Sequence, residues 1–131
     1  MLKTLIVEDN RLNRDTLKKL FSRHFSSLGI EDAADGRESM QKLESFQPDL
    51  ILMDIRLPDV SGLELTKAIK VKTPHVKVVI LTGHHYPEYE EAATRYGADG
   101  FLVKGGSSKE ILELVETLVP KAKEVTSVEK K

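Results

Sequence analysis

Four short apolar runs in this sequence each end at residues whose side chains can take part in chemistry. Glu8 and Asp9 follow the first run, Asp54 the second, Thr82 the third and Lys104 the fourth. Three carboxylates in one place repel each other and raise each other's pKa unless a cation joins them. Their donor atoms are all oxygen, which favours a hard cation such as Mg²⁺. A hydroxyl and a lysine beside such a cluster would suit phosphoryl transfer.

The apolar runs have the length and composition of buried β-strands. They do not alternate with polar residues, and several are β-branched, which is typical of strands covered on both faces of a parallel sheet. A weaker run at residues 30–34 contains two acidic residues and is predicted to be an edge strand. The four stronger runs are residues 5–7, 50–53, 78–81 and 101–103.

Between the runs the apolar residues recur at helical spacing, as in residues 89–96 and 111–118. Five strands alternating with five helices predict an α/β fold, a (βα)5 doubly wound five-stranded parallel sheet with helices on both faces. The common strand order for such a sheet is 2-1-3-4-5, the flavodoxin-like arrangement. Sites in these folds lie beyond the carboxyl ends of the strands, near strands 1 and 3. The reactive residues therefore stand where this fold builds its sites.

Several residues predict where the helices begin and end. The pairs Asp35 with Glu38 and Ser107 with Glu110 resemble capping boxes, and Pro87 suits a first helical turn. Helix ends are predicted at three residues, which are Gly29, Pro74 and Gly97.

Composition limits the classes of protein to consider. The chain has 131 residues, 20 Lys and Arg, 21 Asp and Glu, a net charge of -1 and no cysteine. This predicts one domain without disulfides, thiolate metal sites or a thiol nucleophile. Neither direct nucleic-acid binding nor membrane association is expected, and without a signal-peptide pattern or a long apolar run a cytoplasmic location is expected.

The same residues carry a resemblance to a known family. Glu8-Asp9, the segment 53–64, Thr82-Gly83 and the segment 97–104 are similar to the receiver domain of two-component response regulators. The resemblance covers residues 3 to about 119. We therefore expect a receiver domain at residues 1–119, followed at 120–131 by a helix end and a polar tail or linker.

The resemblance implies a role for each matching position. Asp54 matches the phosphorylated aspartate, and Thr82 and Lys104 match the residues that contact the phosphoryl group. Thr82 and Phe101 match the two switch residues, of which Phe101 is the aromatic one, while Pro58 and Gly62 match the loop after the phosphorylation site. The implied Mg²⁺ ligands are Glu8, Asp9, Asp54 and the backbone carbonyl of Arg56.

The implied function is a phosphorylation-activated signalling switch without a diffusible metabolite as substrate. Asp54 would accept its phosphoryl group from the phosphohistidine of a sensor histidine kinase or phosphotransfer protein. The surface formed by the fourth helix, the fifth strand and the fifth helix would then change. Through that surface the domain would form a homodimer or act on a C-terminal output domain of helix-turn-helix type. Two positions depart from the common pattern: Glu8 replaces an aspartate, and Gly105 stands where many members have proline.

Other functions remain as alternatives. An aspartate-nucleophile phosphohydrolase would need a general acid two residues after Asp54, where this chain has Arg56. A flavin phosphate would be repelled by Glu8 and Asp9. A degenerate receiver that acts only as a docking module would not need the reactive residues. The adjacent His84 and His85 are expected in a solvated loop, and the lysines at 67–77 on a solvated face.

Overall fold

The computed structural model describes residues 1–125, and a sheet of five parallel strands forms its centre. The strands are β1 (Leu2–Val7), β2 (Leu28–Ala33), β3 (Leu50–Asp54), β4 (Lys77–Thr82) and β5 (Gly100–Val103). They lie in the order β2-β1-β3-β4-β5, and all neighbours are parallel. This confirms the expected fold and strand order, with β2 at one edge.

The central strands are buried on both faces, as their continuous apolar sequences predict. In β1, Leu5 and Val7 belong to one hydrophobic cluster, whereas Leu2 and Ile6 belong to the other. The side chains of β3 and β4 divide between the two clusters in the same alternating way. Successive side chains of a strand point to opposite faces, so each central strand contributes to two cores.

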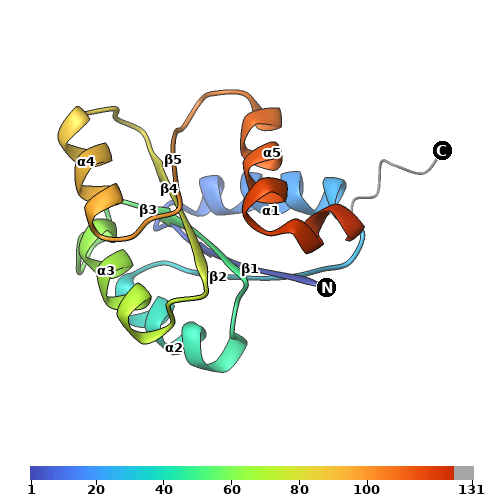
Figure 1. The fold of residues 1–131 in the computed structure, drawn as a ribbon, viewed down its shortest axis with the longest axis horizontal. Coiled ribbons are helices and arrows are strands. Elements are labelled where there is room, and N and C mark those ends of the chain that lie inside the picture. The colour runs from blue at the N-terminus through green and yellow to red at the C-terminus, as the bar shows by residue number, and fades with distance from the viewer. Residues whose placement is uncertain (126–131) are drawn as a thin grey trace.

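Five α-helices in residues 1–125 cover the two faces of the sheet (Figure 1). They are α1 (Arg11–His24), α2 (Gly36–Phe46), α3 (Gly62–Lys72), α4 (Pro87–Arg95) and α5 (Ser108–Leu118). Phe21 of α1 and Val115 of α5 pack in one cluster, whereas Leu43 of α2, Ile69 of α3 and Ala93 of α4 pack in the other. No helix in this part of the chain is long and apolar enough to cross a membrane.

Two predicted capping boxes each form only in part. The Asp35 side chain accepts a hydrogen bond from the Glu38 N–H at 2.8 Å and caps α2. Glu38 in return accepts from the N–H of Ala34 at 2.9 Å, one residue earlier than a capping box requires. Ser107 caps α5 by accepting from the N–H of Lys109 at 3.1 Å. Both helices therefore begin where the sequence predicts.

The other boundary predictions are confirmed with one exception. Pro87 is the first residue of α4, α3 ends two residues before Pro74, and Gly97 follows α4 with a left-handed φ of 97°. The helix end expected at Gly29 is wrong, because α1 already ends at His24 and Gly29 lies inside β2. Phe25 is extended and almost fully buried, so the chain leaves the helix in order to bury this ring.

The residues after α5 form a 3-10 helix, η1 (Pro120–Val125). Ala122 is fully buried in the cluster that also contains Leu2, and the Lys121 ammonium lies 3.0 Å from the carboxylate of Asp49. The start of the expected polar tail therefore packs against the sheet. The rest of that tail, residues 126–131, lies outside the described residues, and the domain boundary at 119 stays a prediction.

Candidate functional site

Three carboxylates converge at the carboxyl ends of β1 and β3. Asp54 is the last residue of β3, and Glu8 and Asp9 directly follow β1, which is the neighbouring strand. Each contributes an oxygen atom, and these atoms all lie within 4.8 Å of one another. Glu8 and Asp54 are buried, with 3% and 8% of their surface exposed, whereas Asp9 is exposed. The predicted acidic cluster is therefore present, with one member open to solvent.

Lys104 reaches the same cluster from the loop after β5. Its Nζ atom lies 2.5 Å from Oε1 of Glu8 and 3.6 Å from Oδ1 of Asp54. The main-chain N–H of Lys104 also donates to the main-chain carbonyl of Thr82 at 2.7 Å, and this bond connects the loop to the end of β4. The fold thus brings together residues that are 96 positions apart, and the ammonium offsets part of the buried negative charge.

The two buried carboxylates respond to this environment in opposite directions. Burial disfavours the charge of Glu8, but hydrogen bonds from Lys104 and from the Asn10 N–H outweigh it and hold its pKa below the usual value. Burial and the neighbouring Glu8 charge raise the pKa of Asp54 to about 6, and Lys104 offsets only part of this increase. In the absence of a metal ion, the repulsion between the two carboxylates therefore raises the pKa of Asp54 and not that of Glu8.

The loop after β3 is folded tightly against Asp54. The main chain of Arg56 helps to lower the pKa of the Asp54 carboxyl, and the Arg56 side chain is exposed. The N–H of Gly62 donates to the carbonyl of Ile55 at 2.7 Å. A Cβ atom on Gly62 would lie 1.9 Å from the main-chain oxygen of Asp54, so only glycine allows this approach. The loop places the main chain of Arg56 beside the acidic cluster.

Thr82 ends β4 at the same edge of the sheet and is buried. Its hydroxyl donates to the His84 carbonyl at 3.1 Å and accepts from the His84 N–H at 3.2 Å. β3 and β4 are neighbours, with Asp54 paired to Leu81 in the register, so Thr82 follows the residue beside Asp54. In this structure its hydroxyl is bonded to the loop before α4.

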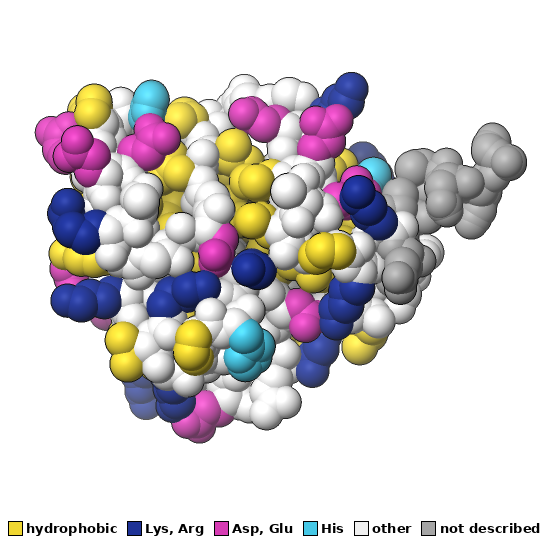
Figure 2. Space-filling model, in the orientation of Figure 1, with side chains coloured by type: hydrophobic (Ala, Val, Ile, Leu, Met, Phe, Trp, Pro, Cys, Tyr) yellow, Lys and Arg dark blue, Asp and Glu magenta, His cyan; other side chains and the backbone are white. Residues whose placement is uncertain are grey.

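Phe101 lies in β5, away from the carboxylates, and is half-buried against the cluster of α2, α3 and α4. Its ring centroid is 6.0 Å from that of His85 in the loop before α4. Figure 2 shows hydrophobic side chains between α4 and α5, over β5, with acidic side chains along the upper border. The expected signalling surface is therefore a partly apolar face, and Phe101 contacts the loop that follows Thr82.

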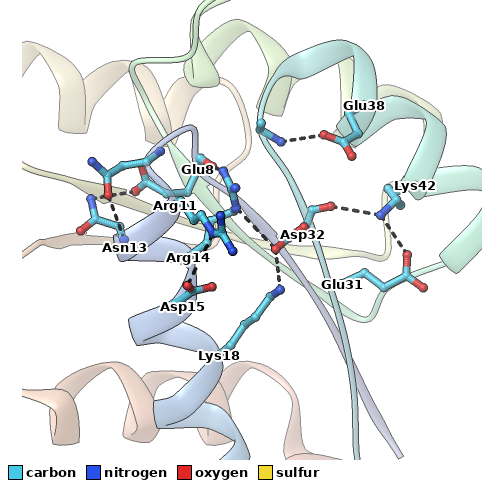
Figure 3. A network of polar contacts seen from close by, with 12 residues as sticks. Glu8, Arg11, Asn13, Arg14, Asp15, Lys18, Glu31, Asp32, Glu38 and Lys42 are labelled. Carbon is cyan, nitrogen blue, oxygen red and sulfur yellow. Dashed lines mark hydrogen bonds and ion pairs between the residues drawn. The ribbon is translucent and has the colours of Figure 1, made fainter.

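Sequence reasoning missed two residues that contact Glu8. The Asn13 side-chain amide lies 3.5 Å from Oε1 of Glu8, and the Arg14 guanidinium donates to the Glu8 carbonyl at 2.8 Å (Figure 3). Asn10 also contributes, because its N–H donates to Oε2 of Glu8 at 3.1 Å and its side chain caps α1. Polar residues in the first turns of a helix resemble a solvated face, so the sequence carried no clear signal for Asn13 and Arg14.

The histidines and surface lysines form contacts of their own. The ring of His84 stacks on Tyr86, and the imidazole of His85 lies 3.1 Å from a carboxylate oxygen of Glu90. Lys70 pairs with Asp99 at 3.0 Å, and Lys72 pairs with Glu44 at 2.6 Å. In the described part of the chain, the group of three residues able to hold a metal consists of Glu8, Asp9 and Asp54 and includes no histidine.

Comparison with known proteins identifies the family. Residues 4–116 match the response regulator receiver domain family. Among curated proteins, LnrK of Bacillus subtilis is 35% identical over 118 residues, which cover 90% of this chain and 54% of LnrK. VraR of Staphylococcus aureus is 32% identical over 114 residues, which cover 87% of this chain and 54% of VraR.

Solved structures that are similar to this chain also come from response regulators. A CheY-like receiver domain protein from Methanospirillum hungatei has 30% identity and a TM-score of 0.84, covering 95% of this chain and 98% of that one. A DNA-binding response regulator of the LuxR family from Staphylococcus aureus has 28% identity and a TM-score of 0.79, with coverage of 90% and 98%. The chain therefore belongs to the response regulator receiver domain family, as its motifs predict. It spans about half the length of the curated relatives it matches.

Proposed function

We propose that this domain is a Mg²⁺-dependent phosphorylation switch in which Asp54 accepts the phosphoryl group. The observation that carries the proposal is the convergence of three carboxylates within 4.8 Å, with the ammonium of Lys104 between Glu8 and Asp54. Phosphoryl transfer requires mainly positioning and charge neutralisation. The arrangement supplies a nucleophilic carboxylate, a group of oxygen ligands and a fixed cation.

The residues present fit Mg²⁺. The donors are carboxylate oxygens on an accessible edge, and this ion prefers few protein ligands with room for waters and phosphate. Asp9, Asp54 and the backbone carbonyl of Arg56 would hold it directly. Both oxygens of Glu8 already accept hydrogen bonds, so we infer that Glu8 contacts the ion through water. When bound, the ion would neutralise the carboxylates and the negative charge of the incoming phosphoryl group.

The transfer step follows from the chemistry of a carboxylate nucleophile. An oxygen of Asp54 attacks phosphorus, and the bond between phosphorus and the histidine nitrogen of the donor breaks. The electron pair of that bond stays on the imidazole, which leaves as a neutral group when its other nitrogen carries a proton. The product is an aspartyl phosphate, which adds negative charge close to Lys104 and Thr82.

Thr82 and Lys104 would then respond to the new group. Lys104 would exchange its Glu8 contact for a phosphoryl oxygen, and the Thr82 hydroxyl would leave His84 and donate to the same group. Because Phe101 contacts the loop that contains His85, movement of this loop would let the Phe101 ring turn inward. One covalent event would thus alter the face formed by α4, β5 and α5.

The proposed partners follow from this mechanism. A sensor histidine kinase or phosphotransfer protein would supply the phosphohistidine, and no diffusible metabolite would be turned over. The α4-β5-α5 face would pass the signal on, through a homodimer or an output domain of the helix-turn-helix type expected from the sequence. The similarity to LnrK and other transcriptional regulatory proteins supports an output on DNA. The cytoplasmic location stays a prediction.

The proposal can be tested by measuring the mass of the intact chain after incubation with Mg²⁺ and a small acyl phosphate. We expect the addition of one phosphoryl group to the wild type and none to Asp54→Asn, because the amide is not a nucleophile for phosphorus. Asp15→Asn is the matched control, since the side chain of Asp15 on α1 is 50% exposed and does not belong to the acidic cluster. This control should be labelled like the wild type.

Chelation of Mg²⁺ should abolish the labelling, and restoration of the ion should recover it. Labelling that persists in Asp54→Asn would assign the phosphoryl group to another residue and contradict the proposal. Sustained turnover of phosphomonoesters would instead support the phosphohydrolase alternative.

A further inference from the structure

The main chain of Glu8 is fixed by a group outside the acidic cluster. β1 ends at Val7, and the Glu8 N–H still donates to the carbonyl of Ala33 in β2 at 3.0 Å. The Glu8 carbonyl has left the strand ladder and accepts from the Arg14 guanidinium at 2.8 Å. Arg14 lies one turn into α1, so this bond connects the end of β1 to the helix that follows.

Arg14 is itself held by Asp32 on β2 (Figure 3). Its Nε lies 3.4 Å from Oδ2 of Asp32, and only 17% of the Arg14 side chain is exposed. The same oxygen accepts from Lys18 at 2.6 Å, and Lys42 donates to the Asp32 carbonyl at 3.1 Å. Asp32 is therefore surrounded by three cations, of which only Arg14 also touches Glu8.

The environment of Asp32 keeps it ionised and able to hold Arg14. Burial alone would raise its pKa, but Lys18, Arg14 and Lys42 together keep the pKa of Asp32 below the usual value. A planar guanidinium can bond two acceptors in fixed directions, which a lysine ammonium does less well. Arg14 uses this property to join a carboxylate on β2 and a carbonyl at the end of β1.

We propose that Arg14, held by Asp32, is a positioning residue that fixes the Glu8 main chain and thereby sets the affinity of the acidic cluster for Mg²⁺. This inference rests on the proposed function, because it requires the cluster to bind the ion. It adds two residues to that proposal, one on α1 and one on β2, and neither belongs to the motifs. Groups that orient metal ligands in this way commonly change metal affinity about tenfold or more when they are removed.

Charge and positioning predict opposite results when Arg14 is removed. Arg14→Met deletes a positive charge beside the acidic cluster, so a purely electrostatic role predicts tighter Mg²⁺ binding. A positioning role predicts weaker binding, because the Glu8 carbonyl loses its donor and the segment before α1 loses its anchor. The methionine keeps much of the apolar volume of the arginine stem, so packing changes little.

The test is a titration of the metal-free full chain with Mg²⁺ alone. Calorimetry, or the amide NMR shifts of Glu8 and Asp9, measures the binding. We expect Arg14→Met to weaken the affinity about tenfold. Arg14→Lys keeps the charge and should also weaken binding, by a smaller factor. Lys18→Met is the matched control, because Lys18 contacts Asp32 without touching Glu8, and its affinity should stay within about twofold of the wild type or increase.

Circular dichroism and urea unfolding show which variants are folded at the temperature of the titration. If Arg14→Met does not fold, Arg14→Lys decides, because electrostatics alone predicts no change for this variant. Folded variants of Arg14 with wild-type or tighter Mg²⁺ affinity would overturn the inference while leaving the proposed function intact. A wild-type chain that does not bind Mg²⁺ would overturn both.

Discussion

The side chain of Asp54 is buried beside Glu8, and this raises its pKa from 3.8 to about 6. The folded protein therefore retains the Asp54 proton to a higher pH than the unfolded chain does. The Asp54 contribution to the free energy of unfolding is most favourable below pH 4, decreases as the pH rises to about 6, and stays low above that. A nucleophile placed this way is destabilising until a cation binds beside it.

The unfavourable charge of Asp54 beside Glu8 predicts that Asp54→Asn stabilises the metal-free protein at pH 7. The neutral amide removes the repulsion with Glu8, so the free energy of unfolding should increase by on the order of 1 kcal/mol. Urea unfolding of both proteins in the presence of a chelator measures this difference in the free energy of unfolding. The gain should shrink at pH 4, where Asp54 is already largely protonated. A variant no more stable than the wild type at pH 7 would show that Lys104 fully offsets the repulsion.

At the scale of elements, the start of α3 lies directly against the end of β3. Gly62 is the first residue of α3, and its N–H bonds to the carbonyl of Ile55. A Cβ atom at Gly62 would collide with main-chain atoms, which cannot move aside as a flexible side chain does. The close approach of these two elements determines where the Asp54 main chain lies.

We expect Gly62→Ala to lower the free energy of unfolding by about 2 kcal/mol, since overpacking forces the backbone apart. The same variant should lose phosphoryl labelling, because Asp54 shifts with its backbone. Gly83→Ala is the matched control: Gly83 follows Thr82, yet a Cβ there would meet no atom within 4 Å. Its stability should change by less than about 0.5 kcal/mol. Equal losses in the two variants would show that the collision at Gly62 is not the cause.

At the scale of the whole molecule, η1 extends the core beyond α5. Ala122 is fully buried with residues of β1 and α5, and Lys121 pairs with Asp49. A chain that ends at Val119 should therefore unfold at a lower urea concentration than one that ends at Val125. The expected difference is about 1 kcal/mol, the value of burying a small apolar group. Equal stability of the two chains would place the end of the folded domain at Val119.

The fold was largely readable from the sequence because its signals are local. Buried strands without alternation, amphipathic spacing between them and capping residues such as Ser107 fixed the elements and their order. The prediction at Gly29 was wrong because a tertiary interaction, the burial of Phe25, ends α1 five residues earlier. Local propensity contains no information about such a contact.

The sequence by itself determined which reactive residues stand at the carboxyl edge of the sheet, since Glu8, Asp9, Asp54, Thr82 and Lys104 each end or directly follow a strand. Parallel strands align their carboxyl ends, so strand assignment was enough to predict the cluster. Only the tertiary structure decided the contacts: the Lys104 bond to Glu8, the raised pKa of Asp54, and the support of Glu8 by Arg14 and Asp32. These depend on distances of a few ångströms between segments remote in sequence, and such distances are set by packing.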